Sequence, residues 1–216
     1  MVAKTIAARL SGNISDVQRC GLIRALGAIF LSDTTNPKLP DYVIDALHAE
    51  LNSGNLDIVS EAARAVGKVR AGRTEIIDKL LSISTNLSAP SALPNSAIEA
   101  LGRCQSEPEN VIPVLVSFLG QEEPPEEVFG ALAAYGDRAV GPLITRWKLS
   151  ADSERVTIAR CFERIQSPAS PAIPLLTAAL GSSDSALAHS CLAGSRQTWA
   201  GYVDRNPRYW TMFVFW

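Results

Sequence analysis

The stretch Arg24-Ala25-Leu26-Gly27 recurs along the chain, as Arg64-Ala65-Val66-Gly67 and then as Glu99-Ala100-Leu101-Gly102. Weaker copies follow, and the second position of every copy holds a small residue: Ala25, Ala65, Ala100, Ala131, Cys161 and Cys191. Successive copies are 40, 35, 31, 30 and 30 residues apart. Self-similarity with a period between about 20 and 50 residues indicates stacked structural repeats that share one core.

A second pattern alternates with the first and has a similar period. Its clearest copy is Val111-Ile112-Pro113-Val114-Leu115, and its third position falls at residues 45, 78, 113, 142 and 174. The intervals are 33, 35, 29 and 32 residues. Two interleaved patterns with one period indicate that each repeat contains two elements.

Both elements are predicted to be helices, because their apolar residues recur at helical spacing. In the run from Asp57 to Val69, the apolar positions 58, 62, 65, 66 and 69 share one face. We expect the first helices to start close to three prolines, Pro113, Pro142 and Pro174. We expect the second helices to start after four capping residues: Asp16, Asp57, Ser153 and Asp184. No stretch alternates with period two for long enough to predict a sheet.

These patterns resemble HEAT repeats, in particular the short bacterial type that also occurs in phycobilisome-lyase-like families. The resemblance rests on the Ile-Pro-x-Leu phrase of the first helix and the Arg-Ala-Leu-Gly phrase of the second, over residues 2–195. Asp45 and Asp78 depart from it, since other repeats have proline there. The resemblance implies an all-α fold, a right-handed α-solenoid of about six HEAT-like helix pairs. We therefore expect a repeat domain over 1–195 and a separate segment over 196–216.

The segment 196–216 contains seven of the 14 aromatic residues of the chain. Three explanations stay open at this point. The aromatic side chains could cover the last apolar face of the solenoid. They could instead anchor a partner, or the segment could be an altered or shortened end of a longer repeat protein.

Composition limits the classes of function. The chain has 216 residues, 47% hydrophobic residues and a net charge of −2. No apolar run approaches the 18 or so residues of a membrane-spanning helix. Nor does the beginning of the chain look like a secretory signal. We therefore expect a cytoplasmic protein without a membrane partner. The near-neutral charge disfavours nucleic acid as a partner.

The residues indicate no catalytic or metal site. The two histidines, His48 and His189, lie in different repeats, and neither belongs to a zinc-binding helix motif. The four cysteines show no C-x-x-C spacing, and Cys161 and Cys191 occupy the small-residue position, where we expect buried fillers. Phosphate-binding and nucleophile-elbow motifs are also absent from the sequence. We expect a non-enzyme with no cofactor and no metal.

Cations recur on the second helices, just before the small position and one turn after it. The resemblance places second helices on the concave face of the solenoid. We therefore predict a partner-binding row there, made of Arg64, Lys68, Arg103, Tyr135, Arg160 and Arg164. In the alternative interpretation the cations are solvated or pair with nearby carboxylates, namely Glu61, Glu99, Glu127 and Glu163.

The leading hypothesis is therefore a non-catalytic protein–protein interaction scaffold that binds a protein partner on its concave face. By family analogy, the alternative is a phycobilin-lyase-like protein that handles a tetrapyrrole (bilin). A HEAT-like nucleic-acid binder is a third and weaker hypothesis, because the sequence pI is about 5.7.

Overall fold

The computed structural model describes residues 2–31, 39–86, 88–165, 170–180 and 184–194. Within these ranges the regular structure is helical, and no residue is in a strand. The chain divides into two compact units, Met1–Glu107 and Pro108–Trp216.

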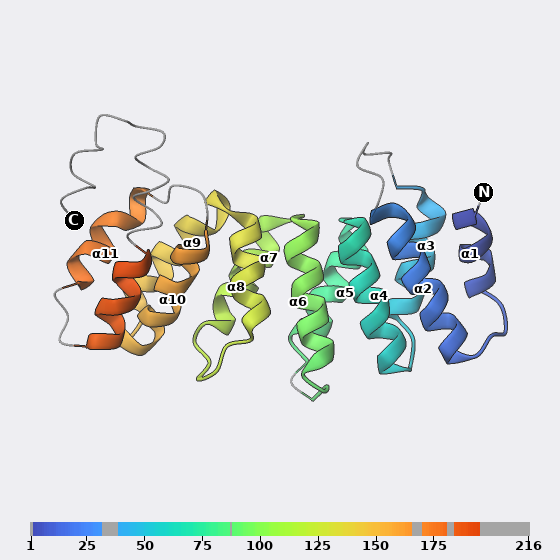
Figure 1. Ribbon diagram of the computed structural model, residues 1–216, viewed down its shortest axis with the longest axis horizontal. Helices are drawn as coiled ribbons and strands as arrows, with labels where there is room; N and C mark the ends of the chain where they lie inside the picture. Colours follow the sequence, from blue (N-terminus) through green and yellow to red (C-terminus); the bar gives the residue numbers. More distant parts are fainter. Residues whose placement is uncertain (1, 32–38, 87, 166–169, 181–183, 195–216) are drawn as a thin grey trace. The chain divides into compact units, whose positions relative to one another are not determined.

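Unit 1 consists of three helix pairs (Figure 1). Its helices are α1 (Val2–Leu10), α2 (Asp16–Leu31), α3 (Asp41–Leu51), α4 (Leu56–Val69), α5 (Thr74–Ser84) and α6 (Ala92–Cys104). The first helices of the pairs form one layer, in which α3 contacts both α1 and α5. The second helices form another, in which α4 lies between α2 and α6. This is the arrangement of stacked two-helix repeats.

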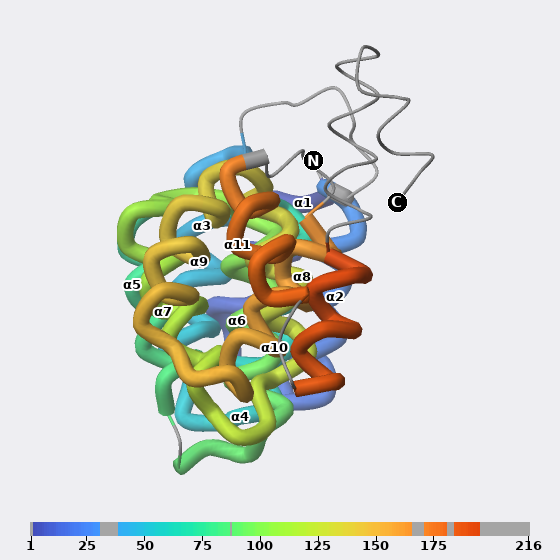
Figure 2. The backbone as a smooth tube through the Cα atoms, turned by 90° about the vertical axis from the view of Figure 1, so that its left-hand side faces the viewer, coloured from blue at the N-terminus to red at the C-terminus, as the bar shows by residue number. Residues whose placement is uncertain are grey.

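Unit 2 continues the same pattern. It contains α7 (Pro108–Phe118), α8 (Glu126–Tyr135), α9 (Asp137–Leu149), α10 (Asp152–Arg164), the 3-10 turn η1 (Ser170–Ala172), α11 (Ile173–Ala179) and a helix over residues 185–194. Figure 2 shows α7 and α9 in one layer and α8 and α10 in the other. The six predicted helix pairs are thus confirmed in the described residues. The segment 196–216 lies outside them, so its role and the boundary at residue 195 stay predictions.

The recurring phrase acts through a close contact between neighbouring second helices. A Cβ added to Gly27 would lie 3.3 Å from Cα of Ala65, and one added to Gly67 would lie 2.9 Å from Cα of Ala100. The glycine of one pair therefore faces the small residue of the next pair. Helices can approach this closely only where both side chains are minimal.

Three of the four predicted helix caps are one or two residues out of place. In α2, Ser15 and Gln18 form a reciprocal capping box, while Asp16 lies inside the helix. Asn55 caps α4 by accepting from the amide of Asp57 at 2.9 Å. Ser153 lies inside α10, which begins after Ala151 with no side-chain cap. The fourth prediction is confirmed, since the Asp184 carboxylate accepts from two amides of the helix that follows.

Two of the three prolines also differ from expectation. Pro174 lies in the first turn of α11, as predicted. However, Pro113 and Pro142 lie inside α7 and α9, because both helices begin about one turn earlier than expected. Each removes an amide that would otherwise donate within the helix.

A buried ion pair fastens the first helix pair to the second. The carboxylate of Glu50 on α3 is 7% exposed and lies 2.7 Å from the Arg19 guanidinium of α2. Arg19 also donates to the carbonyl oxygens of Leu10 and Gly12 in the connection between α1 and α2. One side chain therefore joins α2, α3 and the end of α1.

We expect Gly67→Ala to lower the free energy of unfolding by about 1–3 kcal/mol, since the new methyl group overlaps the backbone of Ala100. Gly21→Ala in α2 is the matched control, because a Cβ there meets nothing within 4 Å. It should raise stability by up to about 1 kcal/mol through helix propensity. Denaturant unfolding of both variants measures the difference, and equal effects would contradict the close-contact explanation.

We expect Arg19→Met to cost about 2 kcal/mol of stability, because it leaves the Glu50 carboxylate buried without its cation. This is below the value for fully buried pairs, since Arg19 is 23% exposed. The double variant Arg19→Met/Glu50→Met should recover most of the loss in the same unfolding experiment. A double variant less stable than Arg19→Met alone contradicts the assignment.

Candidate partner-binding surface

The six residues of the predicted row are divided between the two units. Arg64 and Lys68 lie on α4 and Arg103 on α6, all in unit 1. The other three lie on α8 and α10 in unit 2. Two separate clusters therefore have to be considered.

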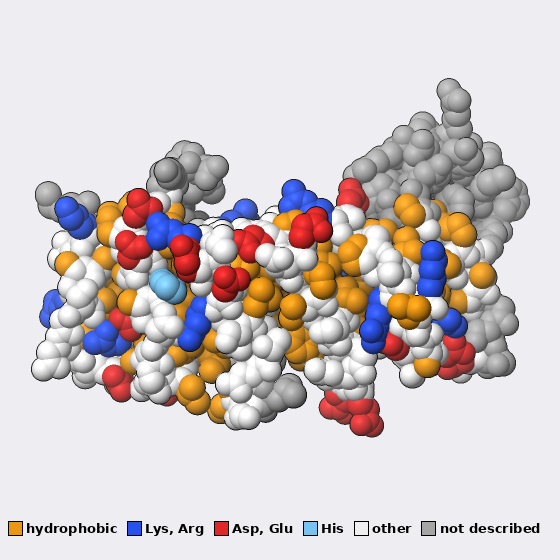
Figure 3. All heavy atoms as spheres, turned by 180° about the vertical axis from the view of Figure 1, so that it is seen from behind, with side chains coloured by type: hydrophobic (Ala, Val, Ile, Leu, Met, Phe, Trp, Pro, Cys, Tyr) orange, Lys and Arg blue, Asp and Glu red, His pale blue; other side chains and the backbone are white. Residues whose placement is uncertain are grey.

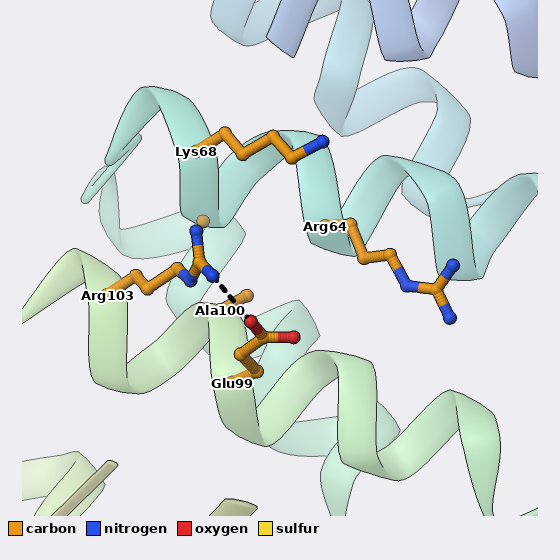
Figure 4. A pocket seen from close by; sticks show the side chains of 6 residues that line it. Arg64, Lys68, Glu99, Ala100 and Arg103 are labelled. Atoms are coloured by element: carbon orange, nitrogen blue, oxygen red, sulfur yellow. Dashed lines mark hydrogen bonds and ion pairs between the residues drawn. The ribbon is translucent and has the colours of Figure 1, made fainter. Parts of the chain in front are cut away.

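In unit 1 the three cations surround one small pocket (Figure 4). It has a volume of about 70 Å³ and is lined by Arg64, Gly67, Lys68, Glu99, Ala100 and Arg103. The close contact between Gly67 and Ala100 forms its base. Cδ of Arg103 lies over Gly67, and Cδ of Lys68 lies over Gly27 in the same way. The glycines thus make room for the methylene stems, whose charged ends remain near solvent.

The carboxylates around this pocket neutralise only part of its charge. Arg103 donates to Glu99 at 2.7 Å, as the alternative interpretation of the sequence predicts. Arg64 lies 3.4 Å from Glu61, which also accepts from Arg24 at 3.0 Å. Lys68 has no ion pair with any residue that the structure describes, and Figure 4 shows its chain extended away from Glu99. Counted with their neighbours among the described residues, the four cations Arg24, Arg64, Lys68 and Arg103 are therefore offset by only two ion-pairing carboxylates, Glu61 and Glu99.

In unit 2, Arg160 and Arg164 share one aromatic ring and one carboxylate. Their guanidinium carbons lie 4.4 Å and 5.5 Å from the ring centroid of Phe129 on α8. Both form ion pairs with Glu126, one turn earlier on α8. The sequence suggested Glu127 and Glu163 as partners, so the carboxylate that pairs with these arginines was missed. Its signal was the Glu126-x-x-Phe129 spacing, which places both side chains on one helix face.

Tyr135 does not belong to an exposed row. It is the last residue of α8 and only 5% exposed. It lies four residues after the small residue Ala131, on the side of the helix that faces the core. The position equivalent to Lys68, Arg103 and Arg164 in this repeat is Ala134, three residues after the small residue, and Tyr135 lies one position further on. We leave Tyr135 out of the proposed surface.

Charges of both signs are mixed on the opposite face of unit 1. Figure 3 looks onto the first helices, where acidic and basic side chains lie next to one another. Arg73, just before α5, bonds to Asp45 at 2.8 Å and to Asp41 at 2.7 Å on α3. Asp45 occupies the position where other repeats have proline. This departure from the repeat is therefore explained by an ion pair between neighbouring helix pairs.

The cysteine side chains behave as fillers. All four are free thiols, and Cys161 and Cys191 are buried in the small-residue position, as predicted. Burial raises the pKa of Cys161 and of Cys104 to about 12, so neither forms the reactive thiolate near neutral pH. Among the described residues, no group of three or more His, Cys, Asp or Glu side chains could hold a metal ion.

No known family's sequence profile matches the chain, and no curated protein matches it by sequence. Within the described part of the chain, no helix combines the length and apolarity needed to cross a bilayer.

Solved structures do resemble it. An engineered protein shares 21% identity and a TM-score of 0.53 over 91% of this chain and 57% of its own length. The complex of CpcE and CpcF of phycocyanin lyase from a Nostoc species shares 19% identity and a TM-score of 0.50, over 77% of this chain and 67% of the other. A chain from a structure of the interaction between cadherin and β-catenin shares 14% identity and a TM-score of 0.53. The match covers 90% of this chain and 44% of the other.

These identities are below 25%, so the likenesses establish the fold alone. The chain has the HEAT-like fold of stacked helix pairs, as the repeat phrases indicated. This chain covers 57% of the length of the engineered protein.

The raised thiol pKa values predict a loss of stability at high pH. An unfolded thiol ionises near pH 9, whereas folded Cys161 holds its proton up to about pH 12, so stability falls as the pH rises between these values. Between pH 8 and 10.5 the contribution of Cys161 is a loss of about 2 kcal/mol. The variant Cys161→Ala has at this position the alanine found in other repeats, and it lacks the thiol. Over the same pH range, its free energy of unfolding should therefore fall by about 2 kcal/mol less than that of the unaltered chain. An identical pH dependence in both proteins would contradict the assignment.

Proposed function

We propose that this protein is a non-catalytic scaffold that binds an acidic segment of a protein partner on the second-helix face of unit 1. The observation that carries the proposal is the charge around the α4–α6 pocket, where Arg64, Lys68 and Arg103, with the neighbouring Arg24, outnumber the carboxylates of Glu99 and Glu61. A surface with fixed excess positive charge favours and steers an acidic partner.

The existing ion pairs oppose such binding only weakly. The Arg64 and Arg103 side chains are 47% and 48% exposed, and pairs of this kind contribute less than about 1 kcal/mol each. Their guanidinium groups can therefore accept a second carboxylate while remaining near their present partners. The Lys68 ammonium needs to release no partner at all among the described residues.

Two of the similar structures support an interaction role. One is a complex of CpcE with CpcF, and the other concerns the interaction between cadherin and β-catenin. In this chain, Arg160 and Arg164 of unit 2 form a second candidate contact. They are a weaker one, because Glu126 and Phe129 already engage both guanidinium groups.

Reversing two charges tests the proposal. We expect Arg64→Glu/Lys68→Glu to lose the partner that the unaltered chain captures from cells that produce it, as identified by mass spectrometry. Both side chains lie at the surface of α4, so the melting temperature should change by no more than a few degrees.

The matched control is Lys4→Glu/Arg9→Glu, which makes the same change of charge on exposed positions of α1. This variant should capture the same partner as the unaltered chain. If Arg64→Glu/Lys68→Glu captures the same proteins at the same yield, the proposal is wrong.

A further inference from the structure

A second and larger groove lies beside the cationic pocket. It has a volume of about 320 Å³ and is formed by α2, the first half of α4 and the start of α6. Arg64 lines both cavities. The two are therefore parts of one continuous surface within unit 1.

The lining of this groove is half apolar and half polar. Cys20, Leu56, Pro90, Ala92 and Leu93 are apolar or weakly polar, and the remaining lining residues are Arg24, Asp57, Ser60, Glu61 and Arg64. Leu56, the first residue of α4, is 48% exposed, although large aliphatic side chains of this unit are mostly buried. Its exposure at the groove leaves an apolar surface that a ligand side chain could cover.

The α4 helix orders these chemical features along one line. Leu56, Ser60, Arg64 and Lys68 are spaced four residues apart, so they follow one another along a stripe that winds by about 40° per step around the helix. The stripe is apolar at its beginning and cationic at its end. Leu56 and Arg64 are eight residues apart, which corresponds to about 12 Å of helix. An extended peptide covers this distance with three to four residues.

Arg64 lines both cavities and forms an ion pair with Glu61. Glu61 accepts from both Arg24 and Arg64, which aligns the two guanidinium groups along the wall of the groove. The Arg64 bond to Glu61 uses one N–H at 3.4 Å, so most of its donors are available to a ligand.

We propose that the acidic segment bound by unit 1 also carries a large apolar side chain, three or four residues away from its first acidic residue. The apolar side chain occupies the groove beside Leu56, and the acidic residues contact Arg64 and Lys68. The inference rests on the proposed function, because it assumes that the basic pocket binds the acidic part of the same segment. It adds the apolar anchor, the spacing and the direction along α4.

The probe is a displayed library of random twelve-residue peptides, selected on the immobilised full chain. We expect the enriched peptides to contain acidic residues and, three or four positions from them, a Leu, Phe or Trp. Leu56→Gln should weaken the binding of a selected peptide roughly tenfold. Replacement of the peptide's apolar residue by Ala should weaken it similarly, as measured by fluorescence anisotropy.

Leu149→Gln in unit 2 is the matched control, because Leu149 is also an exposed aliphatic residue, at 81%. It should leave peptide binding unchanged. Melting temperatures of both variants verify that each is folded, which the exposure of both positions favours.

The outcomes separate the two proposals. Acidic peptides without an apolar preference, or binding unchanged by Leu56→Gln, overturn the inference about the anchor and leave the scaffold proposal intact. Selection of no peptide, or of peptides whose binding Arg64→Glu/Lys68→Glu leaves unchanged, overturns both. Loss of binding in Leu56→Gln but not in Leu149→Gln supports the anchor.

Discussion

The close approach of neighbouring second helices is the constraint on which unit 1 depends. Gly27 meets Ala65 at a distance where an added Cβ would be crowded, and Gly67 meets Ala100 at a distance where an added Cβ would force a shift. This contact brings α2, α4 and α6 together and buries the apolar residues beside it, among them Leu26 and Val66. The same contact shapes the surface above it, because the stems of Lys68 and Arg103 lie over the two glycines. Core packing and the position of the cations thus have a common cause.

Much of the fold could be predicted from the sequence, because the period of the two phrases determines where each helix pair occurs. The exact helix boundaries were harder to predict, since two nearby residues can each serve as the N-terminal cap. Ser15 and Asp16 are both good capping residues, as are Asn55 and Asp57, and only the backbone geometry selects the first of each. The prolines were misplaced because a proline is typical of a first turn, whereas α7 and α9 extend about one turn further back.

The candidate site was predictable only where it is local. The bond between Glu99 and Arg103 follows from helical spacing, so it could be anticipated. The partner of Arg160 and Arg164 could not, because Glu126 is 34 and 38 residues distant and lies on another helix. Nor does the sequence indicate that Leu56 borders an open groove. That depends on how α2, α4 and the start of α6 pack, and a periodic apolar pattern gives no sign of it.

Helix α4 carries both halves of the contact between pairs: Ala65 faces the preceding glycine, and Gly67 faces the following alanine. A duplicated copy of this pair would present the correct residue on each side of this contact, so gene duplication could repeat the contact unchanged. The Arg19–Glu50 clamp has no such property, since it also holds the turn that closes the first pair. Growth by duplication would therefore preserve the glycine–alanine contact of the interior pair but not the clamp.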